Sequence, residues 1–155
     1  VVSQHVRRIV WLTGQIECAE VHLAEIAAQD WMVQRLMAFK GIGLVTAAVM
    51  RAEVGSFARF KSAKALARYC ALTPRNASSG ARQSDAGIIQ AGNRMLRTTL
   101  IESAHRLARF DPRCKALAAQ LRARGKHGNV VAVAIANRWV RSLYHEGKQL
   151  EQTVA

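Results

Sequence analysis

The stretch from Trp31 to Phe57 reads WMVQRLMAFKGIGLVTAAVMRAEVGSF, two apolar runs on either side of Gly41-Ile42-Gly43. Glycine carries no side chain that restricts its backbone, so this short sequence lets the chain turn sharply. The two runs are therefore expected to form a pair of helices, and Gly55 is expected to end the second one as its C-cap. A helical hairpin of this kind favours an all-α fold.

The hairpin resembles a helix-hairpin-helix motif. In such a motif the free N–H groups at the start of the second helix point at a phosphate, and the helix dipole favours the negative charge there. Lys40 stands beside the turn and would add a positive charge. We expect Lys40, Gly41 and Gly43 to contact a nucleic-acid backbone without reading its bases. The alternative is an ordinary glycine turn between two packed helices.

The residues before the hairpin carry a different pattern. Apolar side chains within residues 1–29 recur at alternating spacings of three and four, the rhythm of a coiled-coil seam: Ile9, Leu12, Ile16, Ala19, Leu23 and Ile26. We expect a coiled-coil-like helical arm that joins copies of the chain, although three heptads also allow a single amphipathic helix on its own domain. Gly14 costs this helix about 1 kcal/mol relative to alanine. Asp30 interrupts the rhythm and is expected to be the N-cap of the helix that begins at Trp31.

The charge of the chain is strongly positive and unevenly distributed. Lys and Arg outnumber Asp and Glu by 23 to 10, a formal net charge of +13 over 155 residues. Residues 1–55 hold five basic and five acidic side chains, whereas residues 56–148 hold 18 basic and four acidic ones, a net of +14. Such an excess favours a polyanionic partner, above all nucleic acid, with a membrane surface as the weaker alternative. The second part of the chain is expected to bind it.

Other function classes are disfavoured by missing signals. No apolar run approaches the roughly 18 to 20 residues of a membrane span, and no charged-then-apolar leader is present, so a cytoplasmic protein is expected. The three cysteines and five histidines show no paired ligand spacing. We therefore expect no metal site in this chain, and buried thiols. Trp11, Trp31 and Trp139 fall on apolar helix faces and are expected in the core.

The basic half is expected to be helical throughout. One helix is expected over Phe57–Leu72, where Lys61, Lys64 and Arg68 follow the spacing i, i+3, i+7 and form a stripe that neutralises phosphates or is a solvated face. The next helix is expected to be capped by Asn93 and to end at Asp111-Pro112. Two further helices are expected over residues 114–124 and 130–144. The expected organisation is an arm at 1–29, a helical domain with the hairpin motif at 30–148, and a tail at 149–155.

A polar loop separates the first two of these helices. It holds the adjacent Ser78 and Ser79 between Arg75 and Arg82. The candidate residues for contact with DNA or RNA, taken over the whole chain, are Lys40, Gly41, Gly43, Lys61, Lys64, Arg68, Arg75, Arg82, Asn93, Arg94, Arg97, Arg124 and Lys126.

The order of short motifs is specific. The sequence contains GIGLVTAA, then SFARFKSAKALARY, then LTPR with SSG close behind, then AGNRMLR and RARGK. Over residues 36–148 this series resembles the C-terminal transposase domain of the insertion sequence one-ten family and of the related Piv-type DNA invertases. The arm resembles the coiled-coil segment that precedes this domain in the family.

The resemblance implies a part in DNA recombination, guided by a bridge RNA in the insertion-sequence members, and a bacterial protein that acts at the nucleoid. It also implies that Ser79, with Ser78 as the alternative, is a nucleophile that attacks a DNA phosphate. The Mg²⁺ of such an enzyme is expected in a separate RuvC-like domain with an acidic cluster, and no cofactor is expected in this chain, which would be inactive alone. The competing hypothesis is a non-catalytic helix-hairpin-helix module that binds DNA or RNA.

Overall fold

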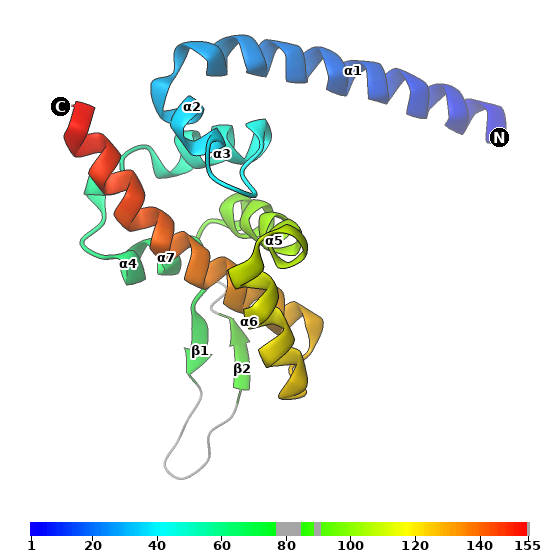
Figure 1. Ribbon diagram of the computed structural model, residues 1–155. Helices are drawn as coiled ribbons and strands as arrows, with labels where there is room; N and C mark the ends of the chain where they lie inside the picture. The colour runs from blue at the N-terminus through cyan, green and yellow to red at the C-terminus, as the bar shows by residue number, and fades with distance from the viewer. Residues whose placement is uncertain (77–84, 89–90, 155) are drawn as a thin grey trace. The chain divides into compact units, whose positions relative to one another are not determined.

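The computed structural model of the protein describes residues 1–76, 85–88 and 91–154 (Figure 1). The described residues are helical apart from short connections and one two-stranded ribbon, which confirms the all-α class. The chain divides into two compact units, Val1–Ala48 and Val49–Ala155, and the boundary falls within a helix. No helix in the described ranges is long and apolar enough to cross a membrane.

The first unit contains α1 (Val2–Gln29), α2 (Trp31–Met37) and the start of α3 (Leu44–Val54). The Asp30 carboxylate accepts hydrogen bonds from the N–H groups of Met32 and Val33, at 2.9 and 3.2 Å, so its prediction as an N-cap is confirmed. The turn from α2 to α3 uses Gly41 in the left-handed region, at φ +80°. The helix–glycine turn–helix arrangement expected from the sequence is therefore present.

The apolar residues of α1 are largely exposed. Ile9, Ile16 and Ile26 on the expected seam are 63%, 58% and 68% exposed, and among the residues of α1 only Ala27 is buried. Trp11 in α1 and Trp31 at the start of α2 are 62% and 41% exposed, so their expected place in the core is wrong. An apolar helix face does not by itself imply burial, and α1 presents its apolar side chains to solvent.

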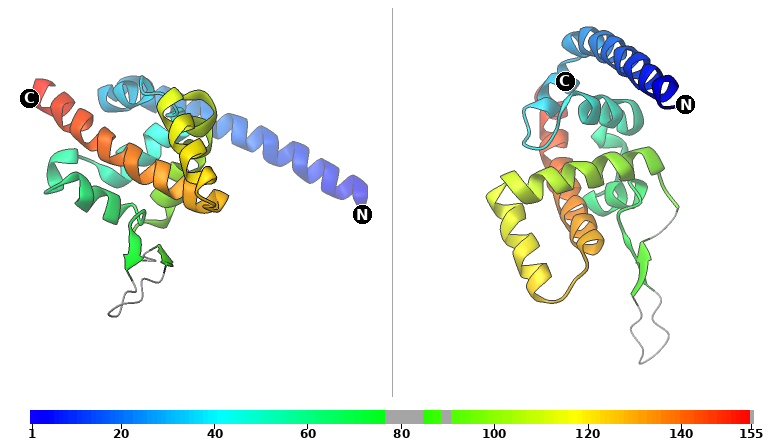
Figure 2. Two further views of the ribbon diagram at one scale, coloured as in Figure 1. Left: turned by 60° about the horizontal axis from the view of Figure 1, so that its bottom comes forward. Right: turned by 90° about the vertical axis from the view of Figure 1, so that its right-hand side faces the viewer.

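The second unit is built around α7 (Gly128–Val154), which packs against four other elements (Figures 1 and 2). These are the short 3-10 helix η1 (Phe57–Arg59), α4 (Ala63–Tyr69), α5 (Arg94–Phe110) and α6 (Pro112–Ala123). Asn93 caps α5 as expected from the sequence, and α5 ends at Phe110, before Asp111-Pro112, as predicted. Asp111 also caps α6, which starts at Pro112 and not at the expected residue 114. Gly55, at φ +66°, follows α3 and donates its N–H to the carbonyl of Arg51, which confirms it as the C-terminal stop.

The single helix expected over Phe57–Leu72 is wrong. The chain forms η1, becomes extended at Phe60, and starts α4 afresh, because the Ser62 hydroxyl accepts the Ala65 N–H at 3.2 Å and so caps a new helix. Lys61 therefore lies before α4, and only Lys64 and Arg68 of the expected stripe belong to the helix.

The last helix is longer than the segment 130–144 predicted for it, and α7 runs on through residues expected to form a tail. Glu151 in this extension accepts hydrogen bonds from the Phe57 N–H, the Ala58 N–H and the Ser56 hydroxyl, at 2.8, 3.0 and 3.1 Å. These contacts join the end of the chain to the start of η1. They explain the extra turns, since the carboxylate satisfies N–H groups of a helix about ninety residues earlier.

A small antiparallel ribbon interrupts the helices. It pairs β1 (Pro74–Asn76) with β2 (Asp85–Ile88), with Pro74 opposite Ile88 and Asn76 opposite Asp85 and an irregular register between them. The sequence indicated only a polar loop here. Residues 77–84 connect the two strands.

Candidate nucleic-acid interface

The ribbon leaves the helical body from a fixed base. On the entering side, the Asn137 amide of α7 donates to the carbonyl of Leu72 at 2.9 Å. On the leaving side, the Asn93 N–H donates to the carbonyl of Tyr69 at 2.8 Å. The segment 73–92 is thus tied to α7 on its entering side and to the end of α4 on its leaving side, and we call these contacts the ribbon base.

Gly92 makes the ribbon base close-packed. Its backbone lies at φ +133°, and a β-carbon there would lie 2.8 Å from the Ala71 β-carbon and 2.9 Å from the Tyr69 carbonyl oxygen. Ala71 itself adopts a left-handed conformation at φ +53°. A residue other than glycine at position 92 would therefore clash with backbone and be conformationally strained.

Asn93 holds the ribbon base to two helices. Its side-chain oxygen accepts the Leu96 N–H at 3.0 Å, and its amide nitrogen donates to the Glu53 carboxylate at the end of α3. The Tyr69 hydroxyl donates to the Glu53 carbonyl at 3.1 Å. The sequence proposed Asn93 both as a cap and as a nucleic-acid contact. The capping is confirmed, and the amide is already engaged within the protein, which indicates a positioning role.

Arg59 completes this cluster. Its guanidinium donates to the carbonyl of Val54 at 3.1 Å and lies 4.8 and 4.9 Å from the ring centres of Phe60 and Tyr69. Such stacking of a cation on two aromatic faces stabilises both rings. No local pattern in the sequence indicates the roles of Glu53 and Asn137, because their partners Asn93 and Leu72 lie 40 and 65 residues away.

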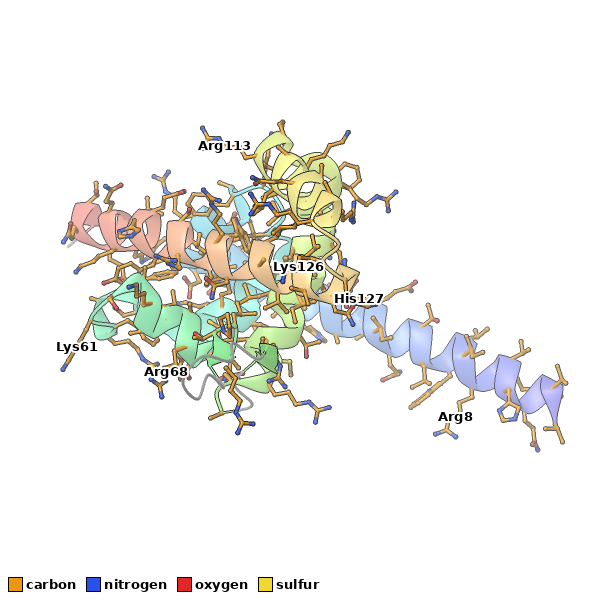
Figure 3. The ribbon with its side chains drawn as sticks, turned by 90° about the horizontal axis from the view of Figure 1, so that it is seen from below. Arg8, Lys61, Arg68, Arg113, Lys126 and His127 are labelled. Atoms are coloured by element: carbon orange, nitrogen blue, oxygen red, sulfur yellow. The ribbon has the colours of Figure 1, made fainter. Side chains whose placement is uncertain are left out.

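Five of the predicted phosphate-binding residues of the second unit are exposed cations around α4, the ribbon and the start of α5: Lys61, Lys64, Arg68, Arg75 and Arg94. Figure 3 shows Lys61 and Arg68 extending outward on the same side of α7. We call these five residues the α4–ribbon surface. Arg124 and Lys126 are exposed in the turn before α7.

Arg97 differs from the other candidates. It lies one turn into α5 and is half-buried, and its Nη1 atom is buried without a hydrogen-bond partner in the described part of the chain. A buried guanidinium N–H of this kind loses its hydration without compensation. Arg97 therefore carries a hydrogen-bond donor for which the described residues provide no acceptor.

The hairpin candidates lie in the first unit. Lys40 and Gly43 are exposed, whereas Ile42 between the two glycines is buried at 6% exposure and anchors the turn. The Ala47 N–H donates to the carbonyl of Gly43 at 2.9 Å, which starts α3 directly at the turn. Lys40, Gly41 and Gly43 are thus brought together at one helix start.

Three candidates, Ser78, Ser79 and Arg82, lie outside the described residues. Within the described ranges, no group of three or more His, Cys, Asp or Glu side chains could hold a metal ion.

The three thiols have different environments. Burial raises the pKa of Cys70 to about 12. Burial, and then the hydrogen bond and negative charge of Asp111, raise the pKa of Cys114 to about 11 against the opposing positive charge of Arg138. Cys18 is exposed on α1, so the expectation that it is buried is wrong.

Comparison with known proteins identifies relatives of one kind. The model of the IS116/IS110/IS902 transposase family matches residues 33–119. Similar proteins include a probable family 20 transposase of Pseudomonas aeruginosa, 32% identical over 145 residues, which are 86% of this chain and 42% of that protein. The transposase for IS1328 of Yersinia enterocolitica is 31% identical (84% and 40% of the two chains), and that for IS1111A of Coxiella burnetii is 35% identical (77% and 34%). The matched region spans less than half the length of each relative.

Proposed function

Because the chain belongs to the IS116/IS110/IS902 family of transposases, we propose that it is the part of a DNA transposase that binds nucleic acid and contributes a serine nucleophile. The observation that carries this proposal is the ribbon base. A segment of the chain that contains two serines is tied at both ends to the helical body, and the exposed cations Arg68, Arg75 and Arg94 lie close to its ends in sequence.

The proposed reaction is an exchange of phosphoesters. The Ser79 hydroxyl oxygen, or that of Ser78, bonds to a DNA phosphorus while one deoxyribose oxygen leaves. The hydroxyl proton passes to a base, the leaving oxygen takes up a proton, and the protein holds the broken end as a phosphoserine ester. A serine needs an activating base or cation, and the phosphate needs its charge neutralised.

In the proposal, residues of this chain neutralise the charge of the phosphate. Arg97, with its unpartnered guanidinium nitrogen, and the exposed Arg75 and Arg94 are suited to stabilise the charge that develops on the phosphate. We assign the base and a Mg²⁺ site to a separate RuvC-like acidic domain of the complete enzyme. Mg²⁺ would polarise the phosphate oxygens there.

Two further contacts belong to the proposal. The α3 start with Lys40, Gly41 and Gly43 would bind a backbone phosphate as a helix-hairpin-helix motif does. A structured guide RNA would be a second ligand beside DNA. The exposed seam of α1 would join copies of the chain, because its a/d spacing matches a coiled coil and its apolar side chains are exposed.

The test is Ser79→Ala in the full-length transposase. We expect recombination to be abolished while DNA binding is unchanged, since the hydroxyl forms the covalent bond but contributes little to affinity. Ser78→Ala is the matched control and should retain recombination. If Ser78→Ala abolishes recombination instead, the nucleophile is Ser78. If both variants recombine normally, the chain is a non-catalytic nucleic-acid-binding module.

A further inference from the structure

A hollow of about 470 Å³ lies along the middle of α7, away from the residues assigned so far. Its described lining comes from one helix: Arg138, Arg141, Ser142 and His145. Separations of three, one and three residues place these side chains on one face of an α-helix. All four are exposed, so the hollow is an open trough that suits a polymer better than a small enclosed ligand. We call these four residues the α7 patch.

The helix that carries the α7 patch is firmly held from its other side. Val140, Leu143 and Tyr144 are buried, and the Tyr144 hydroxyl donates to the carbonyl of Phe60 at 2.9 Å. The helix cannot rotate without breaking these contacts. The positions of the patch residues along α7 are thus fixed before any ligand binds, which lowers the entropic cost of binding.

The patch has no counter-ion of its own. No hydrogen bond or ion pair links Arg138, Arg141 or Ser142 to another residue in the described ranges, and the His145 ring meets only the Tyr144 ring, at 5.2 Å between centres. Within α7, Glu146 directly follows the patch and is the first acidic residue after Gly128. Positively charged side chains that form no ion pair remain available to attract anions.

The donors suit a phosphate backbone. Guanidinium groups bind phosphate oxygens through two parallel hydrogen bonds, and serine hydroxyl and imidazole N–H groups are further donors to phosphate. With a rise of 1.5 Å per residue, Arg138 and His145 are separated by about 10 Å along the axis of α7, enough for more than one phosphate.

We propose that the α7 patch binds the sugar-phosphate backbone of a nucleic acid as a contact separate from the α4–ribbon surface. Figure 3 shows Lys61 and Arg68 on one side of α7 and Arg113 of α6 on the other. Arg138 is close enough to Cys114 of α6 for its charge to act on that thiol, so the patch adjoins the α6 side. The inference rests on the proposed function in assuming a nucleic-acid partner.

The test measures the affinity of the full chain for a labelled DNA duplex and for a labelled RNA hairpin over a series of salt concentrations. Arg138→Ala/Arg141→Ala should weaken binding about tenfold and reduce the slope of log affinity against log salt by about two, since two phosphate contacts are lost. Arg138→Lys/Arg141→Lys should keep the slope, because the charge remains. Arg7→Ala/Arg8→Ala, which removes the same charge from α1, is the matched control and should change neither quantity.

The outcomes separate this inference from the proposed function. If the α7 double variant binds like the α1 control while Lys64→Ala/Arg68→Ala loses affinity, the α7 patch is ordinary solvated surface and the inference fails, but the proposed function stands. If the unmodified chain binds neither ligand, both fail. If the α7 variant loses affinity for only one ligand, the inference holds and that ligand is the one bound by the patch.

Discussion

Gly92 shows how one residue can fix the geometry of a functional segment. Its missing side chain lets the chain that leaves β2 contact the backbone of Tyr69 and Ala71, and Asn93 directly after it binds α3, α4 and α5. The pair Gly92-Asn93 therefore couples the path of the ribbon to three helices. This gives a structural reason for the sequence AGNRMLR that does not depend on ligand contact.

Gly92→Ala should destabilise the second unit by about 1–3 kcal/mol, because the added β-carbon meets backbone atoms at a strained φ. Urea unfolding followed by circular dichroism measures this. Gly125→Ala is the control: it has a positive φ of +73° but nothing within 4 Å of a β-carbon, so it should lose only about 1 kcal/mol. Equal losses in the two variants would mean that the close contact at Gly92 contributes nothing.

The raised pKa of Cys70 predicts its reactivity. Iodoacetamide at about pH 8 reacts with thiolates, so it should modify the exposed Cys18 first and Cys70 only after unfolding. Because the folded pKa of about 12 exceeds the usual value of 9.0, the stability contributed by this buried thiol is complete below pH 9.0 and is lost as pH rises towards 12. Peptide mass spectrometry checks the order; equal rates at Cys18 and Cys70 in the native chain would contradict it.

At the scale of helices and strands, the sequence predicts the features that depend on contacts between residues close together in the chain. Asp30 and Asn93 cap helices as expected, because a capping side chain binds N–H groups two or three residues away. The ribbon was missed since strands of three and four residues carry little signal and depend on each other for pairing. The extension of α7 was missed because Glu151 finds its partners about ninety residues earlier.

The same distinction applies to the candidate site. The cations of the α4–ribbon surface follow from charge counting, and the sequence identifies them without any structure. The hydrogen bond of Asn93 to Glu53 joins residues 40 positions apart, and neither this bond nor the partial burial of Arg97 is indicated by a spacing within the local sequence. The sequence therefore identifies the basic side chains, whereas the fold determines which polar side chains are buried or held by contacts within the protein.

The close packing of η1 against α7 can be tested by adding a methyl group at Gly147, where the two helices meet. A β-carbon at Gly147 would lie 2.6 Å from two ring atoms of Phe57, so Gly147→Ala should destabilise the protein by about 1–3 kcal/mol through overpacking. Gly14→Ala in α1 meets nothing within 4 Å and should instead increase stability by up to about 1 kcal/mol. Thermal unfolding measures both, and a change of the same sign in the two variants would contradict this account of the contact.

The exposed seam of α1 predicts association of the chain with itself. In sedimentation velocity the full chain should form a concentration-dependent oligomer, and Ile16→Asp should make it monomeric by placing a charge in the seam. Val10→Asp is matched, since Val10 is 67% exposed against 58% for Ile16 but lies off the seam. If the full chain is monomeric at every concentration, or if Val10→Asp disrupts the oligomer as strongly, the coiled-coil proposal is wrong.

On the scale of the whole molecule, the positive charge of this chain and the base and Mg²⁺ of the reaction are proposed to belong to different domains. Residues 56–148 carry a net charge of +14. The proposed function assigns nucleic-acid binding to these charges, and it assigns the base and Mg²⁺ for phosphoryl transfer to a further domain. In this proposal, binding and cutting DNA are separable properties.

This division predicts that the chain alone binds plasmid DNA without cutting it. If about eight phosphates are neutralised, affinity should fall by about three to five orders of magnitude between about 50 and 200 mM salt, because bound counterions are released on association. Supercoiled plasmid incubated with the chain and Mg²⁺ should be retarded in a gel at low salt and recovered intact after protease treatment. The full-length transposase is the positive control. Protein covalently attached to nicked plasmid in the sample without the further domain would show that the base and metal site lie within these residues, and a weak dependence of affinity on salt would exclude the basic surfaces as the binding site.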